Sequence, residues 1–448
     1  MSEHFDAIVI GAGPAGEVAA SRLSTQGLRT ALIERELVGG ECAYWACIPS
    51  KTLLRPAEVR GEAERTAGTS APEQQWAQIA EYRDFMIRHL DDTAQVDGYE
   101  KDGVRVYKGD GKLAGPGRVE VAGETLETDR IVIATGSDAR IPVVPGLSQA
   151  GYWTNREATT IKQIPDSVVI LGGGPVGIEL GQFMRRFGTE VTLIQAAERL
   201  LPREDPRVAE LIVERLRADG ITLHLGANAT QTSSSDGQRT ITLDNGETVT
   251  ASKLLIATGR TPRVGDIGLE TVGIEPNPKG IAIDERCRAA EGVWAIGDVT
   301  GVMPFTHVGM YQGRIACADI AGHSAKADYT AIPRVVFSDP EIAAVGLTEQ
   351  QAKERNINIT AATVKLADTI ARPWTYEKDP GGEVGIIADR QKGILVGAWA
   401  VSPLAGESIH YMALAIKTHT TIDVLRDTVA QFPTYTEGYL KAIERLDL

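Results

Sequence analysis

FDAIVIGAGPAGEVAASRLSTQGLRTALIER, residues 5–35, joins an apolar strand, a glycine-rich turn, a helix that stops near Gly27 and a second strand that closes at Glu34. The turn contains three glycines in the spacing GxGxxG, namely Gly11, Gly13 and Gly16. The first allows a sharp turn off the strand, the second lets backbone approach a pyrophosphate, and the third lets the helix pack closely on the sheet. The segment therefore predicts a βαβ unit with a phosphate-binding loop.

The start of the predicted helix is the expected place for the phosphates. Backbone N–H groups and the helix dipole favour negative charge there. In such units an acidic residue about 20 positions further on binds the ribose hydroxyls. Glu34 occupies that place, and the unit predicts a dinucleotide site.

A second segment, SVVILGGGPVGIELGQFMRRFGTEVTLIQ at residues 167–195, repeats the same parts in the same order. Its glycine triplet is Gly172, Gly174 and Gly177, and its closing strand ends at Gln195, at the same distance from the first glycine. Two glycine triplets would not share this context by chance. The chain is therefore predicted to hold a second dinucleotide.

The polar residue that ends the second unit bears on the choice of nucleotide. A carboxylate at Gln195 would bind an NADH ribose and repel the 2′-phosphate of NADPH, whereas an amide repels nothing. Arg199 and Arg203 follow closely and are suited to pair with that phosphate, although surface arginines are common after strands. We favour NADPH and keep NADH open.

Three more apolar strands end in turn residues, and they read IVIATGS at 131–137, LLIATGR at 254–260 and VWAIGDVTG at 293–301. The first two close the nucleotide units and add Thr135, Gly136 and Gly259 as candidate cofactor contacts. Asp298 ends the third strand, at the sheet edge where ligands bind in open α/β sheets. It is expected to bind a ribitol or phosphate-side hydroxyl, and the alternative is an Asp that caps a turn.

Length and composition are those of a multidomain globular protein. At 448 residues the chain exceeds the size that a single hydrophobic core supports. A net charge of −14 argues against a nucleic acid or an anionic membrane as partner. No apolar run approaches a membrane span, and no export signal or set of metal ligands is predicted. With only 4 cysteines we expect a cytoplasmic protein whose cysteines, if special, are redox-active.

Two of these cysteines follow the first dinucleotide unit, in GGECAYWACIPSKTLL at residues 39–54. The spacing of Cys42 and Cys47 predicts that both sulfurs lie near one helix face at a terminus, close enough to bridge. A helix N-terminus also lowers a thiol pKa. The alternative is a buried reduced pair. Cys287 and Cys317 have no such context and are expected to be packing residues.

With these motifs the chain resembles the flavin-dependent pyridine nucleotide–disulfide oxidoreductases, which include dihydrolipoamide dehydrogenase, glutathione reductase and mercuric reductase. GAGPAG with Glu34 resembles the family's FAD fingerprint, and GGEC with CIPSK resembles its redox-active disulfide helix. GGGPVGIELG resembles its NAD(P)H fingerprint, and AIGDVTG its second FAD contact. IPRVVFSDPEIAAVGLTEQQA from residue 332 resembles the opening of its dimerisation domain. The resemblance covers nearly the whole chain.

The resemblance implies a homodimer with FAD and NADPH or NADH as cofactors. Cys47 would be the flavin-facing thiol and Cys42 the interchange thiol that meets the substrate. Lys51 and Glu179 match the family's ion pair beside the reducible flavin nitrogen, and His307 matches a position near the flavin pyrimidine unless it simply packs. The implied FAD contacts are Gly11, Gly13, Pro14, Ala15, Gly16, Glu34, Gly40, Glu41, Lys51, Thr135, Gly136, Asp298 and His307. The implied NAD(P)H contacts are Gly172, Gly174, Gly177, Gln195, Arg199 and Gly259.

The C-terminal segment departs from the family pattern. Disulfide reductases carry His-Pro-Thr-x-x-Glu here, and the histidine acts as acid and base for the interchange thiol of the other subunit. In this chain the segment reads FPTYTEG, with Glu437 kept as a catalytic candidate and Phe432 in place of the histidine. Phe carries no proton, and general acid–base help is worth about 10²–10⁴-fold. Reduction of a small disulfide by the usual route is therefore expected to be impaired.

Other residues also differ from the relatives. Mercuric reductase lacks the histidine but uses a C-terminal cysteine pair, and no cysteine follows Cys317, so we do not expect that activity. Tyr44 and Trp45, between the two cysteines, either flank a flat acceptor or pack. Trp374 and Tyr376 are further candidates for the same role.

Two functions remain after this comparison of motifs. In the first, the protein is an NAD(P)H-dependent flavin disulfide reductase whose substrate needs no histidine, such as a disulfide with an acidic leaving thiol. In the second, it reduces quinones, metal ions or other electron acceptors, and the disulfide is secondary. A flavin-bearing scaffold or redox sensor is the non-enzymatic alternative.

The expected fold is α/β, with two Rossmann-like, doubly wound dinucleotide-binding domains and a C-terminal α+β dimerisation domain. The expected division of the chain is an FAD-binding domain at 1–150, an NAD(P)H-binding domain at 151–270, a return segment of the FAD-binding domain at 271–330, and the dimerisation domain at 331–448.

Overall fold

The computed structural model describes residues 3–448, which form two compact units. Unit 1 comprises residues 3–49, 81–140 and 259–328, and unit 2 comprises residues 50–80, 141–258 and 329–448. The division into four segments expected from the sequence stays a prediction.

Unit 1 is built on a six-stranded sheet of order β18-β19-β8-β2-β3-β4. All neighbours pair in parallel except β18 and β19, which are antiparallel. The strands are β2 (Ala7–Ile10), β3 (Thr30–Glu34), β4 (Val104–Lys108), β8 (Ile131–Ile133), β18 (Arg288–Ala290) and β19 (Val293–Ala295). Because both faces of this sheet are covered, its central strands β2, β8 and β19 are continuous apolar runs.

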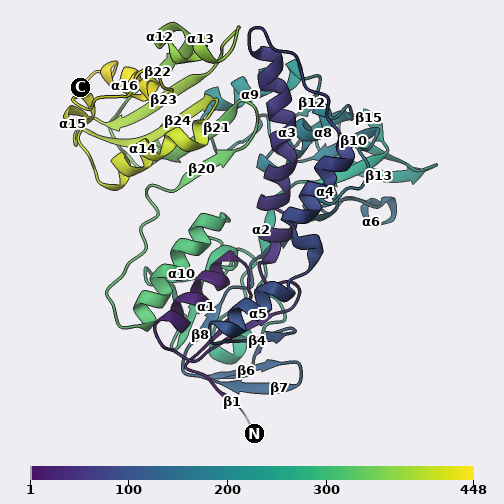
Figure 1. Ribbon diagram of the computed structural model, residues 1–448, viewed down its shortest axis with the longest axis vertical. Helices are drawn as coiled ribbons and strands as arrows, with labels where there is room; N and C mark the ends of the chain where they lie inside the picture. The colour runs from purple at the N-terminus through teal and green to yellow at the C-terminus, as the bar shows by residue number, and fades with distance from the viewer. Residues whose placement is uncertain (1–2) are drawn as a thin grey trace. The chain divides into compact units, whose positions relative to one another are not determined.

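Helices cover one face of this sheet and a second sheet covers the other. Helices α1 (Pro14–Thr25) and α10 (Thr306–Ile320) lie side by side on the face that carries Val9 (Figure 1). The opposite face, with Ile8, packs on a sheet of order β1-β7-β6-β5. Its strands are β1 (Glu3–His4), β5 (Lys112–Leu113), β6 (Arg118–Val121) and β7 (Glu124–Glu127). The remaining elements of unit 1 are α2 (Gly40–Tyr44), η1 (Arg88–Leu90), α5 (Thr93–Lys101), β9 (Ser137–Ala139), β17 (Arg260–Pro262), η2 (Leu269–Val272) and η3 (Gly297–Thr300).

Unit 2 contains a second parallel sheet, of order β12-β11-β10-β16. Its strands are β10 (Ser167–Leu171), β11 (Glu190–Gln195), β12 (Thr222–Leu225) and β16 (Lys253–Ile256). Helices α8 (Pro175–Arg186) and α9 (Pro206–Ala218) pack on the face that carries Val168 and Ile170. The other face meets a three-stranded antiparallel sheet, β13 (Ala229–Ser235), β14 (Gln238–Leu243) and β15 (Thr248–Ala251). This repeats the layered plan of unit 1.

The C-terminal part of unit 2 is an antiparallel sheet of order β20-β21-β24-β23-β22. The strands are β20 (Pro333–Val336), β21 (Glu341–Gly346), β22 (Ile359–Lys365), β23 (Glu383–Asp389) and β24 (Ile394–Ser402). Side chains alternate between its faces. Ala398 packs with α14 (Ala405–Lys417) and α16 (Glu437–Glu444), whereas Trp399 packs with the core that contains α8 and α9.

Two longer helices, α3 (Cys47–Arg65) and α4 (Trp76–Met86), run across the unit boundaries in sequence. The short helices of unit 2 are α6 (Leu147–Ala150), α7 (Asn155–Thr159), α11 (Glu349–Glu354), α12 (Leu366–Thr369), α13 (Arg372–Tyr376) and α15 (Ile422–Arg426). The predicted fold class is confirmed, because two parallel sheets with crossover helices are followed by an antiparallel sheet with helices.

We expect Gly385→Ala to destabilise unit 2. A Cβ atom at Gly385 would lie 2.2 Å from Cε2 of the buried Trp399 indole, and overpacking a core of this kind costs about 1–3 kcal/mol. Urea unfolding should show a lower midpoint with an unchanged slope. Gly381→Ala is the matched control, because a Cβ there has open space around it. Equal midpoints for the two variants would contradict the packing described here.

Candidate active site

The first glycine-rich turn is closed by contacts that leave no room for side chains. Gly11 has φ +103°, and a Cβ atom on it would lie 2.3 Å from the carbonyl oxygen of Ala134. A Cβ atom on Gly16 would lie 1.8 Å from the carbonyl oxygen of Gly11. Gly13 has open space at its Cβ position and is the N-cap of α1, where no side chain caps the helix. The uncapped N–H groups and the open space fit a pyrophosphate.

The second turn has the same geometry in unit 2. Gly172 has φ +116° and a Cβ position 2.3 Å from the carbonyl oxygen of Ala257. A Cβ atom on Gly177 would lie 2.0 Å from the carbonyl oxygen of Gly172. Gly174 is open and is the N-cap of α8, again without a side-chain cap. Both helices therefore present the same anion-binding arrangement.

The polar residues at the strand ends are held against these turns. The Glu34 carboxylate accepts the backbone N–H of Ala12 at 2.7 Å and that of Glu36 at 2.7 Å. Gln195 Oε1 accepts the backbone N–H of Gly173 at 2.8 Å, and its Nε2 donates to the carbonyl oxygen of Arg199 at 3.3 Å. Each side chain is thus held beside its glycine turn, where a bound ribose is expected.

The other expected FAD contacts of unit 1 lie at strand ends. Thr135 Oγ1 donates to the carbonyl oxygen of Arg263 at 2.8 Å, and Gly136 has φ +75°. Asp298 lies in η3 and accepts a hydrogen bond from Ser137 Oγ at 2.5 Å. Asp298 and Glu41 both lie within 4 Å of the Arg260 guanidinium. The structure therefore brings together two acids that come from distant parts of the sequence.

The two cysteines lie on different helices, so the expectation of one shared helix face is wrong. Cys42 is in α2, and Cys47 is the first residue of α3. The chain leaves helical geometry at Trp45, which has φ −136°. The sulfurs nevertheless lie close together, because the Thr306 hydroxyl donates to Cys42 Sγ at 3.3 Å and lies 3.4 Å from Cys47 Sγ.

The pKa of the Cys42 thiol is raised well above its usual value. The main causes are its hydrogen bond with Cys47 and its burial, and the hydrogen bond from Thr306 acts in the opposite direction. This is the reverse of the shift that we expected for Cys42 from a helix N-terminus. Both residues are thiols in this structure. The Thr306 hydroxyl is therefore the neighbouring side chain that favours the Cys42 thiolate.

The aromatic residues near the cysteines have different surroundings. Tyr44 is fully buried, and its hydroxyl donates to the carbonyl oxygen of Val38 at 3.0 Å. Its side chain therefore packs in the core, which is one of the two alternatives considered for it. Trp374 is 61% exposed, and its indole N–H donates to the carbonyl oxygen of Ala367.

The Lys51–Glu179 ion pair implied by the resemblance is formed in unit 2. Lys51 Nζ lies 2.6 Å from Glu179 Oε2 and 4.6 Å from the centre of the Phe337 ring. Glu179 Oε1 also accepts the backbone N–H of Phe337 at 3.0 Å. Glu179 is buried, whereas Lys51 is partly exposed. A buried carboxylate thus holds a cation whose head group still reaches solvent.

At the C-terminal segment, the Phe432 ring is 65% exposed. The Glu437 carboxylate accepts the backbone N–H of Thr434 at 3.0 Å, so it holds the turn. His307 is exposed in the first turn of α10, and its ring stacks on Phe305 with 5.3 Å between centres.

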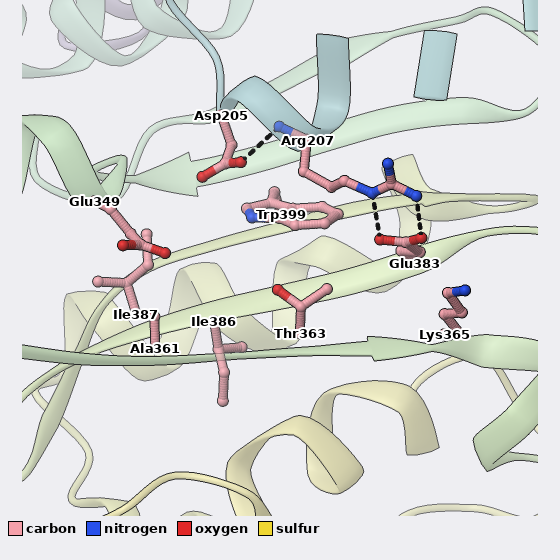
Figure 2. Close-up of a pocket in the computed structure, with 10 residues that line it drawn as sticks. All are labelled: Asp205, Arg207, Glu349, Ala361, Thr363, Lys365, Glu383, Ile386, Ile387 and Trp399. Atoms are coloured by element: carbon pink, nitrogen blue, oxygen red, sulfur yellow. Dashed lines mark hydrogen bonds and ion pairs between the residues drawn. The ribbon is translucent and has the colours of Figure 1, made fainter. Parts of the chain in front are cut away.

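Sequence reasoning missed Thr306 and Arg260. Their partners lie far away in the sequence, so no local spacing indicates them; the nearest signal was that Thr306 directly precedes His307. It also missed a pocket of about 450 Å³ in unit 2 (Figure 2). There Arg207 forms two bonds of 2.9 and 2.6 Å to Glu383, and the Trp399 indole lies between this pair and Asp205. None of the predicted site residues lines this pocket.

No helix within residues 3–448 has the length and apolar character that a membrane crossing needs. Residues 5–313 match the pyridine nucleotide-disulphide oxidoreductase family, and residues 332–443 match the dimerisation domain of that family. A mercuric reductase of Bacillus cereus is 33% identical over 99% of this chain and 72% of its own length. A dihydrolipoyl dehydrogenase of Thermus scotoductus is 33% identical over 99% of this chain and 97% of its own.

Two solved structures have the same fold over nearly the full length. A Cu(II) complex of the HOCl-induced flavoprotein disulfide reductase RclA from Escherichia coli superposes with a TM-score of 0.87 at 27% identity, covering 98% of this chain and 99% of RclA. LpdA from Mycobacterium tuberculosis has a TM-score of 0.87 at 28% identity, covering 98% and 99%. With both phosphate turns in place, the chain belongs to the pyridine nucleotide–disulfide oxidoreductases, enzymes that bind FAD and use NAD(P)H.

Proposed function

We propose that this enzyme passes electrons from NAD(P)H through FAD to the Cys42–Cys47 pair and then to a disulfide whose leaving thiol is acidic. The observation that carries this proposal is the contact of one hydroxyl, that of Thr306, with both sulfurs. A dithiol held in this way is arranged for two-electron exchange. The chemistry supplied by a bound flavin is two-electron transfer between a nicotinamide and such a pair.

The cysteines take different roles in the proposed reaction. Cys42 loses its proton to solvent, and its thiolate attacks one substrate sulfur, which breaks the substrate S–S bond and expels the first thiolate. Cys47 then loses its proton to solvent and attacks Cys42 Sγ, which breaks the mixed disulfide and expels the second thiolate. The enzyme is left with a Cys42–Cys47 disulfide, and the two electrons have gone to the substrate. An acidic leaving thiol departs as a thiolate, so the step needs no proton donor. Such a reaction is compatible with Phe432, which stands where the disulfide reductases of the family carry a histidine.

The chain's charged residues support binding of the two cofactors. Lys51, held by Glu179, would place a cation beside the flavin ring and favour its reduced, anionic form. Glu34 would bind the FAD ribose, and Gln195 a nicotinamide-nucleotide ribose. We favour NADPH, because the Gln195 amide would not repel a 2′-phosphate and Arg199 follows it.

The second candidate function is reduction of quinones, metal ions or other acceptors. The observation that favours it is again Phe432, because electron transfer to such acceptors does not require protonation of a leaving thiol. Among the similar proteins, one is a mercuric reductase and one was solved as a Cu(II) complex, and both support metal ions as candidate acceptors. In this case the disulfide would be secondary.

We also propose that the enzyme is a cytoplasmic homodimer. The match of residues 332–443 to the family's dimerisation domain supports the dimer. The low number of cysteines, 4 in 448 residues, supports a reducing compartment.

Anaerobic titration with NADPH, and in parallel with NADH, tests the role of the cysteines. We expect the wild type to take up two electrons before the flavin bleaches and to develop a long-wavelength thiolate–flavin band. Cys47→Ser should lack the band, and Cys317→Ala is the control because Cys317 is buried away from the pair. Should the flavin bleach first, with Cys42→Ser and Cys47→Ser both reducing quinone at the wild-type rate, the second function replaces the first.

Thr306→Val should make Cys42 less reactive. Loss of the donated hydrogen bond removes a contact that lowers the Cys42 pKa, so the pKa rises further and less thiolate is present at a given pH. Alkylation of the reduced enzyme at pH 8 should slow about tenfold, since a hydrogen bond to a charged group is worth roughly 1.5 kcal/mol. Thr306→Ser keeps the hydroxyl and should react like the wild type. An unchanged rate in Thr306→Val would refute the contact.

Phe432→His tests the missing proton carrier. If the dithiol meets small disulfides and lacks only a base, the variant should reduce lipoamide or glutathione disulfide faster by about 10²-fold. Phe432→Asn is the control, because its amide is polar but does not titrate. No gain in a folded, FAD-loaded Phe432→His variant would show that the histidine is not what limits small-disulfide reduction.

A further inference from the structure

Glu41 lies between Cys42 of the redox pair and Gly40, which abuts the first phosphate turn. It is in the first turn of α2 and precedes Cys42 in sequence. The preceding residue, Gly40, abuts the turn so closely that a Cβ atom on it would lie 2.6 Å from Cα of Gly13. A negative charge here opposes the binding of a pyrophosphate unless a cation offsets it.

Arg260 provides that cation within unit 1. Its Nη2 lies 3.9 Å from Glu41 Oε1, and its Nε lies 3.8 Å from Asp298 Oδ2. All three side chains are partly buried, with exposed fractions of 23% for Arg260, 18% for Glu41 and 25% for Asp298. Charges in this position are screened less by solvent than charges on the open surface.

Ser137 fixes the guanidinium between the two acids. Arg260 Nε donates to Ser137 Oγ at 2.7 Å, and Arg260 Nη2 donates to the Ser137 carbonyl oxygen at 2.7 Å. Ser137 Oγ in turn donates to Asp298 Oδ2 at 2.5 Å. The guanidinium is therefore held at Nε and Nη2, and Asp298 is oriented through the serine hydroxyl.

We propose that Arg260 is a positioning residue of the FAD site, which offsets the charge of Glu41 and orients Asp298 through Ser137. The inference rests on the proposed function, because it takes Asp298 and the turn at Gly13 as FAD contacts. It adds that Glu41 and Arg260 act as a pair. Without Arg260, the Glu41 and Asp298 carboxylates lie at the site with no cation between them. Removing the Glu41 charge as well leaves only that of Asp298.

The test is the FAD dissociation constant of purified holoenzyme, measured by flavin fluorescence on serial dilution without NAD(P)H or acceptor. Arg260→Met should raise it at least tenfold, which equals about 1.4 kcal/mol. Adding Glu41→Gln to Arg260→Met should bring the constant back to within about threefold of the wild type, since the two residues are coupled. Glu41→Gln alone should tighten FAD binding, because it removes a negative charge near the pyrophosphate turn while Arg260 stays in place.

Two further variants test whether the positive charge of Arg260 supports FAD binding. Arg260→Lys retains the positive charge but loses the forked contact with Ser137, so it should weaken FAD binding by less than about tenfold and lie between the wild type and Arg260→Met. Arg288→Met is the matched control, since Arg288 pairs with Asp319 in the same unit and contacts no expected FAD residue. It should leave FAD binding unchanged.

The inference is overturned if Arg260→Met binds FAD like the wild type, or if Glu41→Gln gives no recovery in that background. A tenfold loss in Arg260→Lys would also overturn the charge offset, and this variant decides the matter should Arg260→Met fail to fold. A wild-type protein that holds no FAD would instead defeat the proposed function. The two failures are therefore distinguishable.

Discussion

The absence of a Cβ atom at four glycines is the constraint on which the two nucleotide-binding layers depend. At Gly11 and Gly172 the position of that atom is 2.3 Å from a carbonyl oxygen of the neighbouring strand end. At Gly16 and Gly177 it is 2.0 Å or less from the carbonyl oxygen of the first glycine. Any side chain would push the helix off the sheet, and with it the N–H groups that face the open position at Gly13. The strand, turn and helix can therefore pack in this way only with glycine at these four positions.

The two units share this plan, but they differ in the polar residue that ends each βαβ segment. Glu34 and Gln195 bond to backbone N–H groups of their own turns through the same kind of side-chain oxygen. The carboxylate carries a charge and the amide does not, so the two turns differ in charge at this point. The dithiol follows the first βαβ segment in sequence, and Thr306 of α10 contacts both of its sulfurs.

The segment at Phe432 resembles the family's His-Pro-Thr-x-x-Glu pattern in all but the histidine. Glu437 accepts the backbone N–H of Thr434 and holds the turn, and Phe432 is exposed. The hydrogen bond with Cys47 and burial both raise the pKa of the Cys42 thiol, whereas the hydrogen bond from Thr306 lowers it.

The sequence by itself determined the fold class, both phosphate turns and the strand ends at Glu34 and Gln195, because glycine spacing and apolar periodicity act over short distances along the chain. It also indicated the cysteines and the Lys51–Glu179 pair, through resemblance to a family. Only the tertiary structure decided that the cysteines lie on two helices, that Thr306 contacts both sulfurs and that Arg260 joins Glu41 to Asp298. These contacts join residues more than 200 positions apart in several cases, and no local pattern encodes which side chains the folded layers bring together.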